Sequence, residues 1–209
     1  MTKTISSLLS IVAISTLTIG CESSNTTEKE PTEITTPTAS GTTSSTLNSS
    51  QISAGVITIP VTISVTTTNN TSTATVTLAE GTAFTNSDRN TLNNVIPKLE
   101  LTQETGSSNV TQTVQTKIKL TDVTGNKIIP TEAVKVMIKA PSNAKPGDEV
   151  KVSVPNGASK STTQEKLINF IVDANGFITI TIAPEVFKNF LVILIIIEKT
   201  TVTGLQGGN

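Results

Sequence analysis

Apolar and polar residues alternate one by one over much of the chain after residue 60. Val61, Ile63 and Val65, for example, are separated by Thr62 and Ser64. Strict alternation is typical of strands with one buried and one solvated face, the usual arrangement in antiparallel sheets. The pattern predicts strands at 61–65, 74–78, 114–120, 134–138, 150–154, 168–172 and 178–182.

Short turn signals recur between these strands: Asn69-Asn70, Gly125-Asn126, Pro146–Asp148, Pro155–Gly157 and Asp173–Gly176. Turns at such regular intervals after short strands predict an all-β chain, an antiparallel β-sandwich with immunoglobulin-like or Greek-key connections. The one helical prediction is a short turn that starts at Ser87 or Asp88 and runs through Asn94, before Pro97 ends it.

Phe190–Ile197 is an unbroken run of eight apolar residues. As a helix it would extend only about 12 Å, far less than a bilayer requires. We therefore expect a strand that is buried on both faces, or one whose outer face is covered by a loop or a partner.

The first residues have the pattern of a secretory signal: Lys3 is followed by an uncharged, mostly apolar stretch from Ile5 to Ile19. Leu17-Thr18-Ile19-Gly20-Cys21 resembles the lipobox of bacterial lipoproteins, with Thr18 where that pattern favours Leu. The resemblance implies cleavage between Gly20 and Cys21 and a diacylated, palmitate-type lipid on Cys21. Ordinary signal cleavage after Gly20 and an unmodified Cys21 are the alternatives.

Residues 22–50 contain 16 Ser or Thr among 29 positions, and few apolar side chains. Such a segment buries too little surface to offset the entropy of ordering, so 21–50 is predicted to be a disordered tether. The expected organisation is then a signal peptide at 1–20, the tether, a sandwich domain at 51–203 and a flexible tail at 204–209. Two smaller sandwiches that divide near 122–127 are the alternative.

Two segments of the predicted sandwich, Lys119–Ile128 and Lys145–Val152, resemble parts of the invasin-type, immunoglobulin-like modules of bacterial surface proteins. The resemblance implies a sandwich displayed at a cell surface. The chain has one Cys and no Trp, so the sequence excludes an immunoglobulin domain that is held by a disulfide beside a core Trp.

The chain also has no His and no Tyr. The chain therefore cannot form a Ser–His or Cys–His nucleophile or a metal site with His ligands. Aromatic side chains on which sugars or single-stranded nucleic acid could stack are scarce. We expect no cofactor and no enzyme activity. Paired carboxylates, with Asp148, Glu149 and Asp173 as candidates, remain the only basis for a hydrolase.

Two groups of residues are candidates for ligand binding. Asp173 and Asn175 could offer oxygens to calcium, but a hairpin turn explains the same residues and is favoured. The lysines Lys117, Lys119, Lys135 and Lys139 could attract an anionic partner, although outward-facing lysines also protect ordinary sheets from aggregation.

The chain is nearly neutral, with 15 basic and 16 acidic residues, so no nucleic-acid partner is expected. The sequence predicts a lipoprotein of the bacterial cell envelope, anchored to membrane lipid through Cys21 at the outer membrane or cell surface. Its sandwich would bind an envelope or host protein or a glycan, through loops far from the tether or through a lysine-bearing face. The alternative is a structural subunit of an envelope or filament assembly that pairs strands with its neighbours, for which Phe190–Ile197 is the candidate strand.

Overall fold

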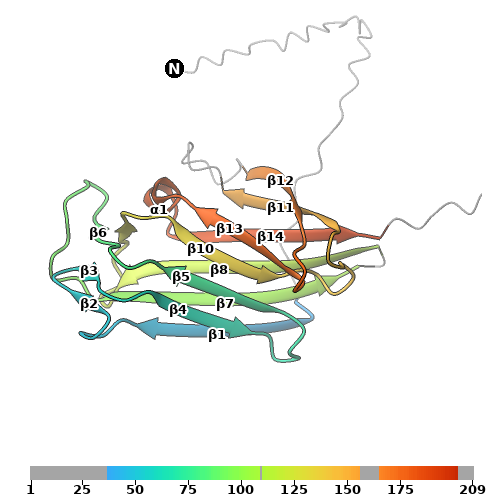
Figure 1. Cartoon of the computed structure of the whole chain (residues 1–209), viewed down its shortest axis with the longest axis horizontal. Helices are drawn as coiled ribbons and strands as arrows, with labels where there is room; N and C mark the ends of the chain where they lie inside the picture. Colours follow the sequence, from blue (N-terminus) through green and yellow to red (C-terminus); the bar gives the residue numbers. More distant parts are fainter. Residues whose placement is uncertain (1–36, 109, 156–164, 202–209) are drawn as a thin grey trace, which may run out of the picture. The chain divides into compact units, whose positions relative to one another are not determined.

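The computed structural model describes residues 37–108, 110–155 and 165–201, and almost all of them lie in or between antiparallel strands (Figure 1). The larger sheet has six strands in the order β1-β7-β8-β14-β11-β12. Its strands are β1 (Ala39–Thr46), β7 (Pro97–Ser107), β8 (Thr111–Asp122), β14 (Val192–Thr200), β11 (Glu149–Pro155) and β12 (Glu165–Ile171).

The second sheet has four strands in the order β13-β10-β5-β4. They are β13 (Phe177–Ile182), β10 (Val134–Lys139), β5 (Thr73–Leu78) and β4 (Val61–Thr66). Two small sheets lie in the loops, β2 (Ile52–Ser53) with β3 (Val56–Ile57), and β6 (Phe84–Thr85) with β9 (Ile129–Pro130).

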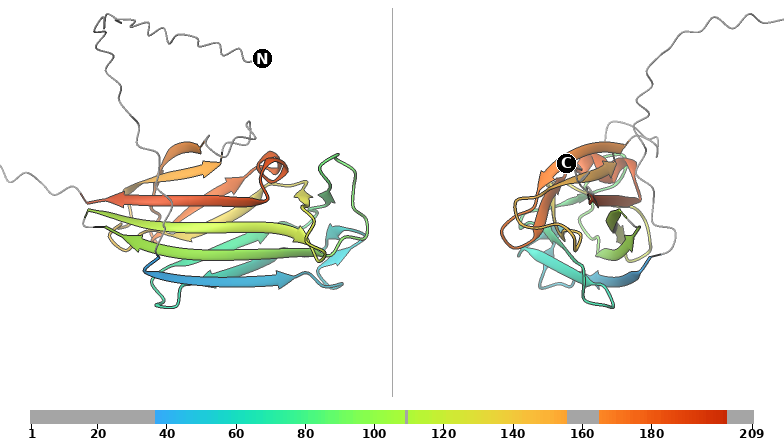
Figure 2. Two further views of the ribbon diagram at one scale, coloured as in Figure 1. Left: turned by 180° about the vertical axis from the view of Figure 1, so that it is seen from behind. Right: turned by 90° about the vertical axis from the view of Figure 1, so that its right-hand side faces the viewer.

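The alternating apolar residues of both large sheets point inward and form one core. On β5 and β10, for instance, Val76, Val136 and Ile138 are all completely buried, while Lys135 before Val136 and Lys139 after Ile138 are exposed. Figure 2 shows from behind and from one end how the two sheets face each other across this core. The prediction of an antiparallel β-sandwich is confirmed.

The sandwich does not divide near 122–127. That segment is the turn after β8, and strands from before and after it pair directly, β5 with β10 and β8 with β14. A single cluster of buried residues runs through both halves. The alternative of two small sandwiches is therefore wrong, because each of the two large sheets contains strands from before and after residues 122–127.

The predicted tether boundary at residue 50 is also wrong. Residues 39–46 form β1, which pairs with β7 from Ala39 opposite Thr105 to Thr46 opposite Lys98, and Leu47 after it is buried in the core. The hydrogen-bonded ladder with β7 orders this segment, although its own side chains are small and polar. The predicted tether between residues 21 and 36, the signal peptide and the tail at 204–209 lie outside the described residues.

The helical prediction for 87–94 is wrong as well. The Asn86 side chain accepts hydrogen bonds from the backbone N–H of Asp88 and Asn90, which holds this segment as a loop. A helix does form elsewhere, α1 (Pro184–Asn189), with Pro184 in its first turn, where a missing N–H costs nothing. None of the described helical residues builds a helix long and apolar enough to cross a membrane.

Strand β14 begins two residues later than the apolar run that predicted it. It is the central connection of the larger sheet, since it pairs with β8 along its whole length and with β11 at its end. Ile195, Ile196 and Ile197 are buried in succession, so both faces of the strand are covered there. The prediction of a strand buried on both faces is confirmed for these three residues, whereas Val192 at the start of the strand is 44% exposed.

The outer face of the larger sheet is not uniformly solvated. Gln115 on β8, Ile196 on β14 and Ser153 on β11 stand opposite one another in one row across the sheet. All three side chains are at most 2% exposed, although their strands turn them away from the core. Both amide atoms of Gln115 are enclosed without a hydrogen-bond partner.

Candidate binding site

The sandwich has a hollow at each end of β1. One hollow is lined by Thr38, just before the strand, and the other by Leu47, just after it. An eight-residue strand spans about 26 Å, which sets the separation of the two ends. The ends therefore offer two separate sites.

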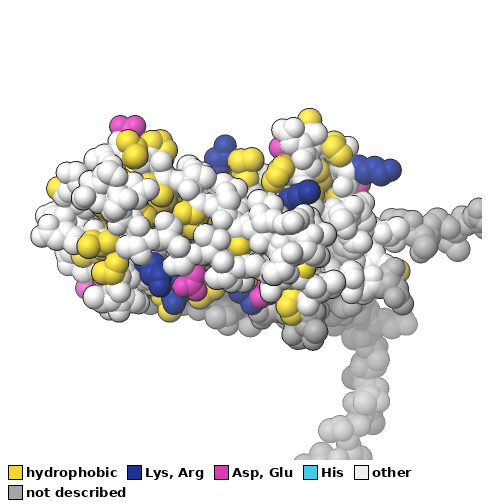
Figure 3. Space-filling model, turned by 90° about the horizontal axis from the view of Figure 1, so that it is seen from below, with side chains coloured by type: hydrophobic (Ala, Val, Ile, Leu, Met, Phe, Trp, Pro, Cys, Tyr) yellow, Lys and Arg dark blue, Asp and Glu magenta, His cyan; other side chains and the backbone are white. Residues whose placement is uncertain are grey.

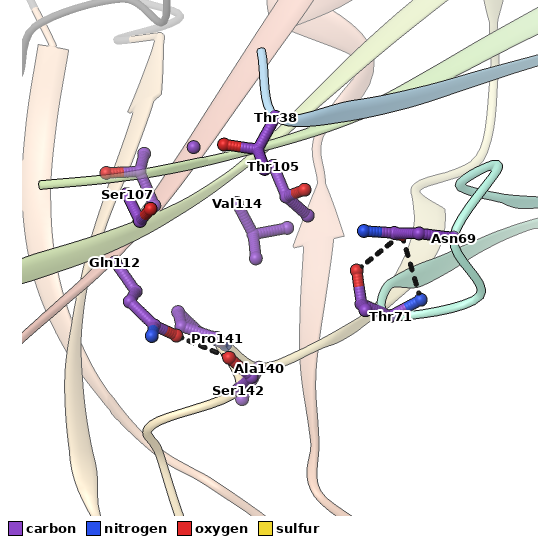
Figure 4. Close-up of a pocket in the computed structure, with 12 residues that line it drawn as sticks. Thr38, Asn69, Thr71, Thr105, Ser107, Gln112, Val114, Ala140, Pro141 and Ser142 are labelled. Carbon is purple, nitrogen blue, oxygen red and sulfur yellow. Dashed lines mark hydrogen bonds between the residues drawn. The ribbon is translucent and has the colours of Figure 1, made fainter.

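The hollow at the start of β1 has a volume of about 210 Å³ and a polar lining (Figure 4). Its walls come from the turn between β4 and β5, the hairpin between β7 and β8, and the loop after β10. It is lined by Thr38, Asn69, Thr71, Thr105, Gly106, Ser107, Gln112, Thr113, Val114, Ala140, Pro141 and Ser142. No residue in this lining ionises near neutral pH, so the hollow offers no general acid or base.

Hydrogen bonds between its own walls fix the shape of this first hollow. The Gln112 side-chain oxygen accepts from the Ser142 hydroxyl and from the Asn143 backbone N–H, at 3.1 Å for the latter. The Asn69 side-chain oxygen accepts from the Thr71 backbone and hydroxyl, as Figure 4 shows. What remains for a ligand is a rim of hydroxyl and amide groups, suited to a small neutral molecule.

The hollow at the far end of β1 has a volume of about 270 Å³ and a more apolar lining. Its residues are Leu47, Asn48, Ser49, Ile52, Ala54, Gly55, Asn93, Asn94, Val95 and Ile96. The loop between β2 and β3 forms one wall, and the segment that leads into β7 forms the other. Ile96 is 46% exposed, so this hollow opens beside an uncovered apolar side chain.

The wall between β2 and β3 is held in an uncommon backbone conformation. Ala54 has φ +48° and Gly55 has φ +76°. A Cβ at Gly55 would lie 2.1 Å from the carbonyl oxygen of Leu92, so the two walls approach at a point where only glycine fits. Positive φ at both residues is the geometry of a tight two-residue hairpin turn between β2 and β3, so this wall of the hollow has a fixed shape.

Further apolar side chains are exposed at the same end of the sandwich. Ile59 precedes β4 and Val123 follows β8, and each is about half exposed. The Val123 backbone N–H donates to the Ile96 carbonyl at 3.1 Å, which places Val123 beside the far hollow. Together, Ile96 and Val123 form an apolar rim next to the opening.

The structure does not bring the four predicted lysines together. Lys117 and Lys119 lie on the outer face of the six-stranded sheet, and Lys135 and Lys139 on the outer face of the four-stranded sheet. Lys117 pairs with Glu104 on β7 at 3.4 Å. On the side shown in Figure 3, Lys and Arg side chains are scattered and some lie beside acidic ones, so no single-sign patch forms there.

Asp173 and Asn175 lie in a turn, as expected, but the prediction of a hairpin is wrong: β12 pairs with β11 and β13 with β10, so the turn connects the two sheets. The Asp173 carboxylate accepts from the backbone N–H groups of Asn175 at 2.9 Å and Phe177 at 2.8 Å. Its oxygens thus stabilise the turn between β12 and β13. Among the described residues no group of three potential metal ligands lies together.

The other two acidic candidates for hydrolysis occupy the segment that begins β11. The Asp148 carboxylate accepts from the Lys145 backbone N–H at 3.1 Å and pairs with Lys199 at 3.2 Å. The hydrogen bond from Lys145, and to a lesser extent the contact with Lys199, hold the pKa of Asp148 below its ordinary value. Neither Asp148, Glu149 nor Asp173 lines either of the two hollows.

Sequence reasoning missed both hollows. Their linings are mostly Ser, Thr, Asn and backbone groups, which carry no spacing signal of their own. A comparison with protein-family models, with curated proteins and with solved structures finds no match to this chain. The fold and the two hollows are therefore what defines this protein: an antiparallel β-sandwich with a neutral hollow at one end and a partly apolar one at the other.

Proposed function

We propose that this chain is an exported bacterial lipoprotein whose β-sandwich binds a partner at the cell envelope without catalysis. The anchor in this proposal is a lipid on Cys21, at the end of the signal-like leader. Two or more acyl chains on one residue would hold the protein at the membrane almost irreversibly. Binding would occur at the far end of β1.

One observation carries the proposal: the direction of β1. The beginning of β1 is the end nearer to Cys21 in the sequence. Leu47, directly after the strand, lines the far hollow. An anchored sandwich would thus hold this hollow and its apolar rim, Ile96 and Val123, one strand length from the point where the chain enters the fold. An exposed apolar rim beside a preformed hollow is typical of binding surfaces.

A binding role fits the chemistry better than hydrolysis does. The three acidic residues that could serve a hydrolase have turn or ion-pair roles, or lie outside both hollows. The lining of the first hollow offers hydroxyls and amides, and that of the second offers amides and apolar groups. Both linings can bind and orient a partner, but neither contains a paired acid and base.

The anchor is tested with the full-length gene expressed in a bacterial host. The intact mass and the detergent partitioning of the native protein are compared with those of a Cys21→Ser variant. We expect acyl chains and a detergent-phase protein that are both lost in the variant. A native mass without acyl chains, together with a membrane-bound variant, would refute the anchor.

The binding surface is tested on the Cys21→Ser protein, which keeps β1; a fragment that starts at residue 51 would lack that strand. Saturable binding to purified envelope fractions and to host-cell surfaces is compared between Ile96→Ser and Val110→Ser. These two side chains are almost equally exposed, at 46% and 48%, but Val110 lies in the hairpin at the opposite end. Binding weakened only by Ile96→Ser supports the proposed surface, and equal effects refute it.

A further inference from the structure

Strand β12 is unlike the other strands at the edges of the two sheets. It is the last strand of the six-stranded sheet, and it exposes Leu167 by 37% and Ile171 by 62%. Ile168 and Phe170, which turn toward the inner side, are only partly buried. Edge strands β1, β4 and β13 instead turn mainly Ser and Thr outward.

Natural sheets protect their edges with proline, charged residues, bulges or very short strands, since an open edge pairs readily with another chain. Strand β12 contains no proline, and its two charged residues, Glu165 and Lys166, are the first two of the strand, so residues 167–171 carry no charge. Among the described residues no strand pairs with the other side of β12, so this apolar edge is suited to pairing.

The backbone groups that would take part in such pairing can be identified. The Val172 N–H donates to the Asp148 carbonyl, and the Val172 carbonyl accepts from the Gly147 N–H, both at 2.9 Å. Val172 thus directs its backbone groups toward the β11 side. Since this direction alternates along a strand, the groups of Leu167, Asn169 and Ile171 point away from β11, toward the open edge.

We infer that β12 pairs antiparallel with β12 of a second copy of this chain, about a twofold axis at Asn169. In this register Leu167 stands opposite the partner's Ile171 on the outer face, and Ile168 opposite the partner's Phe170 on the inner face. Asn169 stands opposite the partner's Asn169. Every apolar residue from 167 to 171 then meets an apolar residue, and the three outward backbone positions form six hydrogen bonds across the axis.

The neighbouring registers match less well. A shift of two residues one way places Leu167 opposite the partner's Asn169, and Ile171 opposite the partner's Glu165. A shift of two the other way pairs Ile171 with the partner's Asn169 and leaves Leu167 opposite a turn residue, the partner's Asp173. A one-residue shift would pair outer-face with inner-face side chains. The Asn169-centred register is the self-complementary one, as an isologous contact requires.

A contact of one strand with one strand is small, so the dimer should be weak and reversible, with a dissociation constant in roughly the micromolar to millimolar range. The pairing does not depend on the lipid anchor or on the far hollow. It would join two six-stranded sheets into one continuous sheet.

The test uses the Cys21→Ser protein in sedimentation equilibrium over a wide range of concentrations. Asn169→Lys and Asn169→Asp each place two like charges directly opposite one another at the axis. Each should weaken dimerisation by roughly tenfold or more, because like charges opposite one another destabilise a strand pair. Mixing the two variants should restore a dimer that contains one copy of each.

Asn169 is exposed, and circular dichroism with a thermal melt checks that both variants keep the fold. Lys135→Asp, at an exposed position on the four-stranded sheet, serves as a surface control and should leave dimerisation unchanged. A protein that is monomeric at all concentrations overturns the inference. Folded variants that dimerise as well as the parent, or a mixture that restores nothing, overturn it too.

Discussion

Gly41 on β1 lies directly against the backbone of Thr66 on β4. A Cβ at position 41 would stand 2.3 Å from the Thr66 carbonyl oxygen, closer than real Cβ atoms come. Beside it, the Thr68 N–H donates to the Ser40 carbonyl at 3.0 Å. The two sheets meet backbone to backbone at this edge, and glycine is what permits the contact.

Gly41→Ala is therefore expected to lower the free energy of unfolding by about 1–3 kcal/mol, the usual cost of forcing a group into packed structure. Urea unfolding followed by circular dichroism measures this loss. Ser44→Ala on the same strand, where the side chain is exposed, is the control and should change stability little. An unchanged midpoint in Gly41→Ala would mean that the two edges are not in contact.

Gln103 is a polar residue completely buried in the core. Its Nε2 donates to the Ser72 hydroxyl at 2.8 Å, and its Oε1 accepts from the Thr116 hydroxyl at 2.6 Å. Gln103→Leu should cost about 1–3 kcal/mol of unfolding free energy, because it leaves the buried Thr116 hydroxyl without its acceptor. The triple variant with Ser72→Ala and Thr116→Val should recover part of the loss, and failure to do so would contradict this explanation.

Gln115 offers the opposite case on the neighbouring strand. It is as deeply buried as Gln103, but neither of its amide atoms has a hydrogen-bond partner among the residues that the structure describes. Gln115→Leu should therefore raise the free energy of unfolding, by about 1 kcal/mol, since it removes an unsatisfied buried amide. The same substitution thus has opposite signs at positions 103 and 115, and a loss of stability at 115 would show that its amide is satisfied in solution.

The turn after β8 predicts a dependence on pH. Burial acts to raise the pKa of Asp122, but hydrogen bonds from the side chains and backbone of Thr124 and Asn126 outweigh it and hold the pKa below its ordinary value. A carboxyl with a lowered pKa in the folded state stabilises the fold above its unfolded pKa of about 3.9. That contribution is lost as the pH falls through the lower, folded value.

Unfolding in urea at a series of pH values below about 5 measures this loss. Asp122→Asn should be less stable than the parent near neutral pH and should lose less stability on acidification. Glu132→Gln, at an exposed position outside this turn, controls for general effects of removing an acid. Parallel pH profiles for the parent and Asp122→Asn would refute the role of Asp122.

The strands that alternation predicted were found because a buried face requires alternating apolar residues. Strand β1 was missed because it lies at an edge, where Gly41 and small hydroxyl side chains fit against β4 and no apolar stripe is needed. The helix expected at 87–94 failed because Asn86 binds the backbone two and four residues ahead. Local sequence does not show which strand a segment will meet.

The candidate site was less predictable than the fold. The lysines were visible in the sequence, but their distribution over two opposite faces depends on which sheet each strand joins. The far hollow depends on Gly55 approaching Leu92, residues 37 positions apart, and that contact exists only after folding. Only the turn at Asp173 could be assigned locally, because its hydrogen bonds reach no further than Phe177.

Strand β14 follows every other strand along the chain, yet it joins β8 to β11 in the middle of the larger sheet. Until residues 192–200 leave the ribosome, the sheet can exist only as two fragments, β1-β7-β8 and β11-β12. A growing chain therefore cannot complete its fold before β14 has been synthesised, and until then it should remain able to pass through a translocation pore. The order of the strands thus delays folding for as long as export would need it.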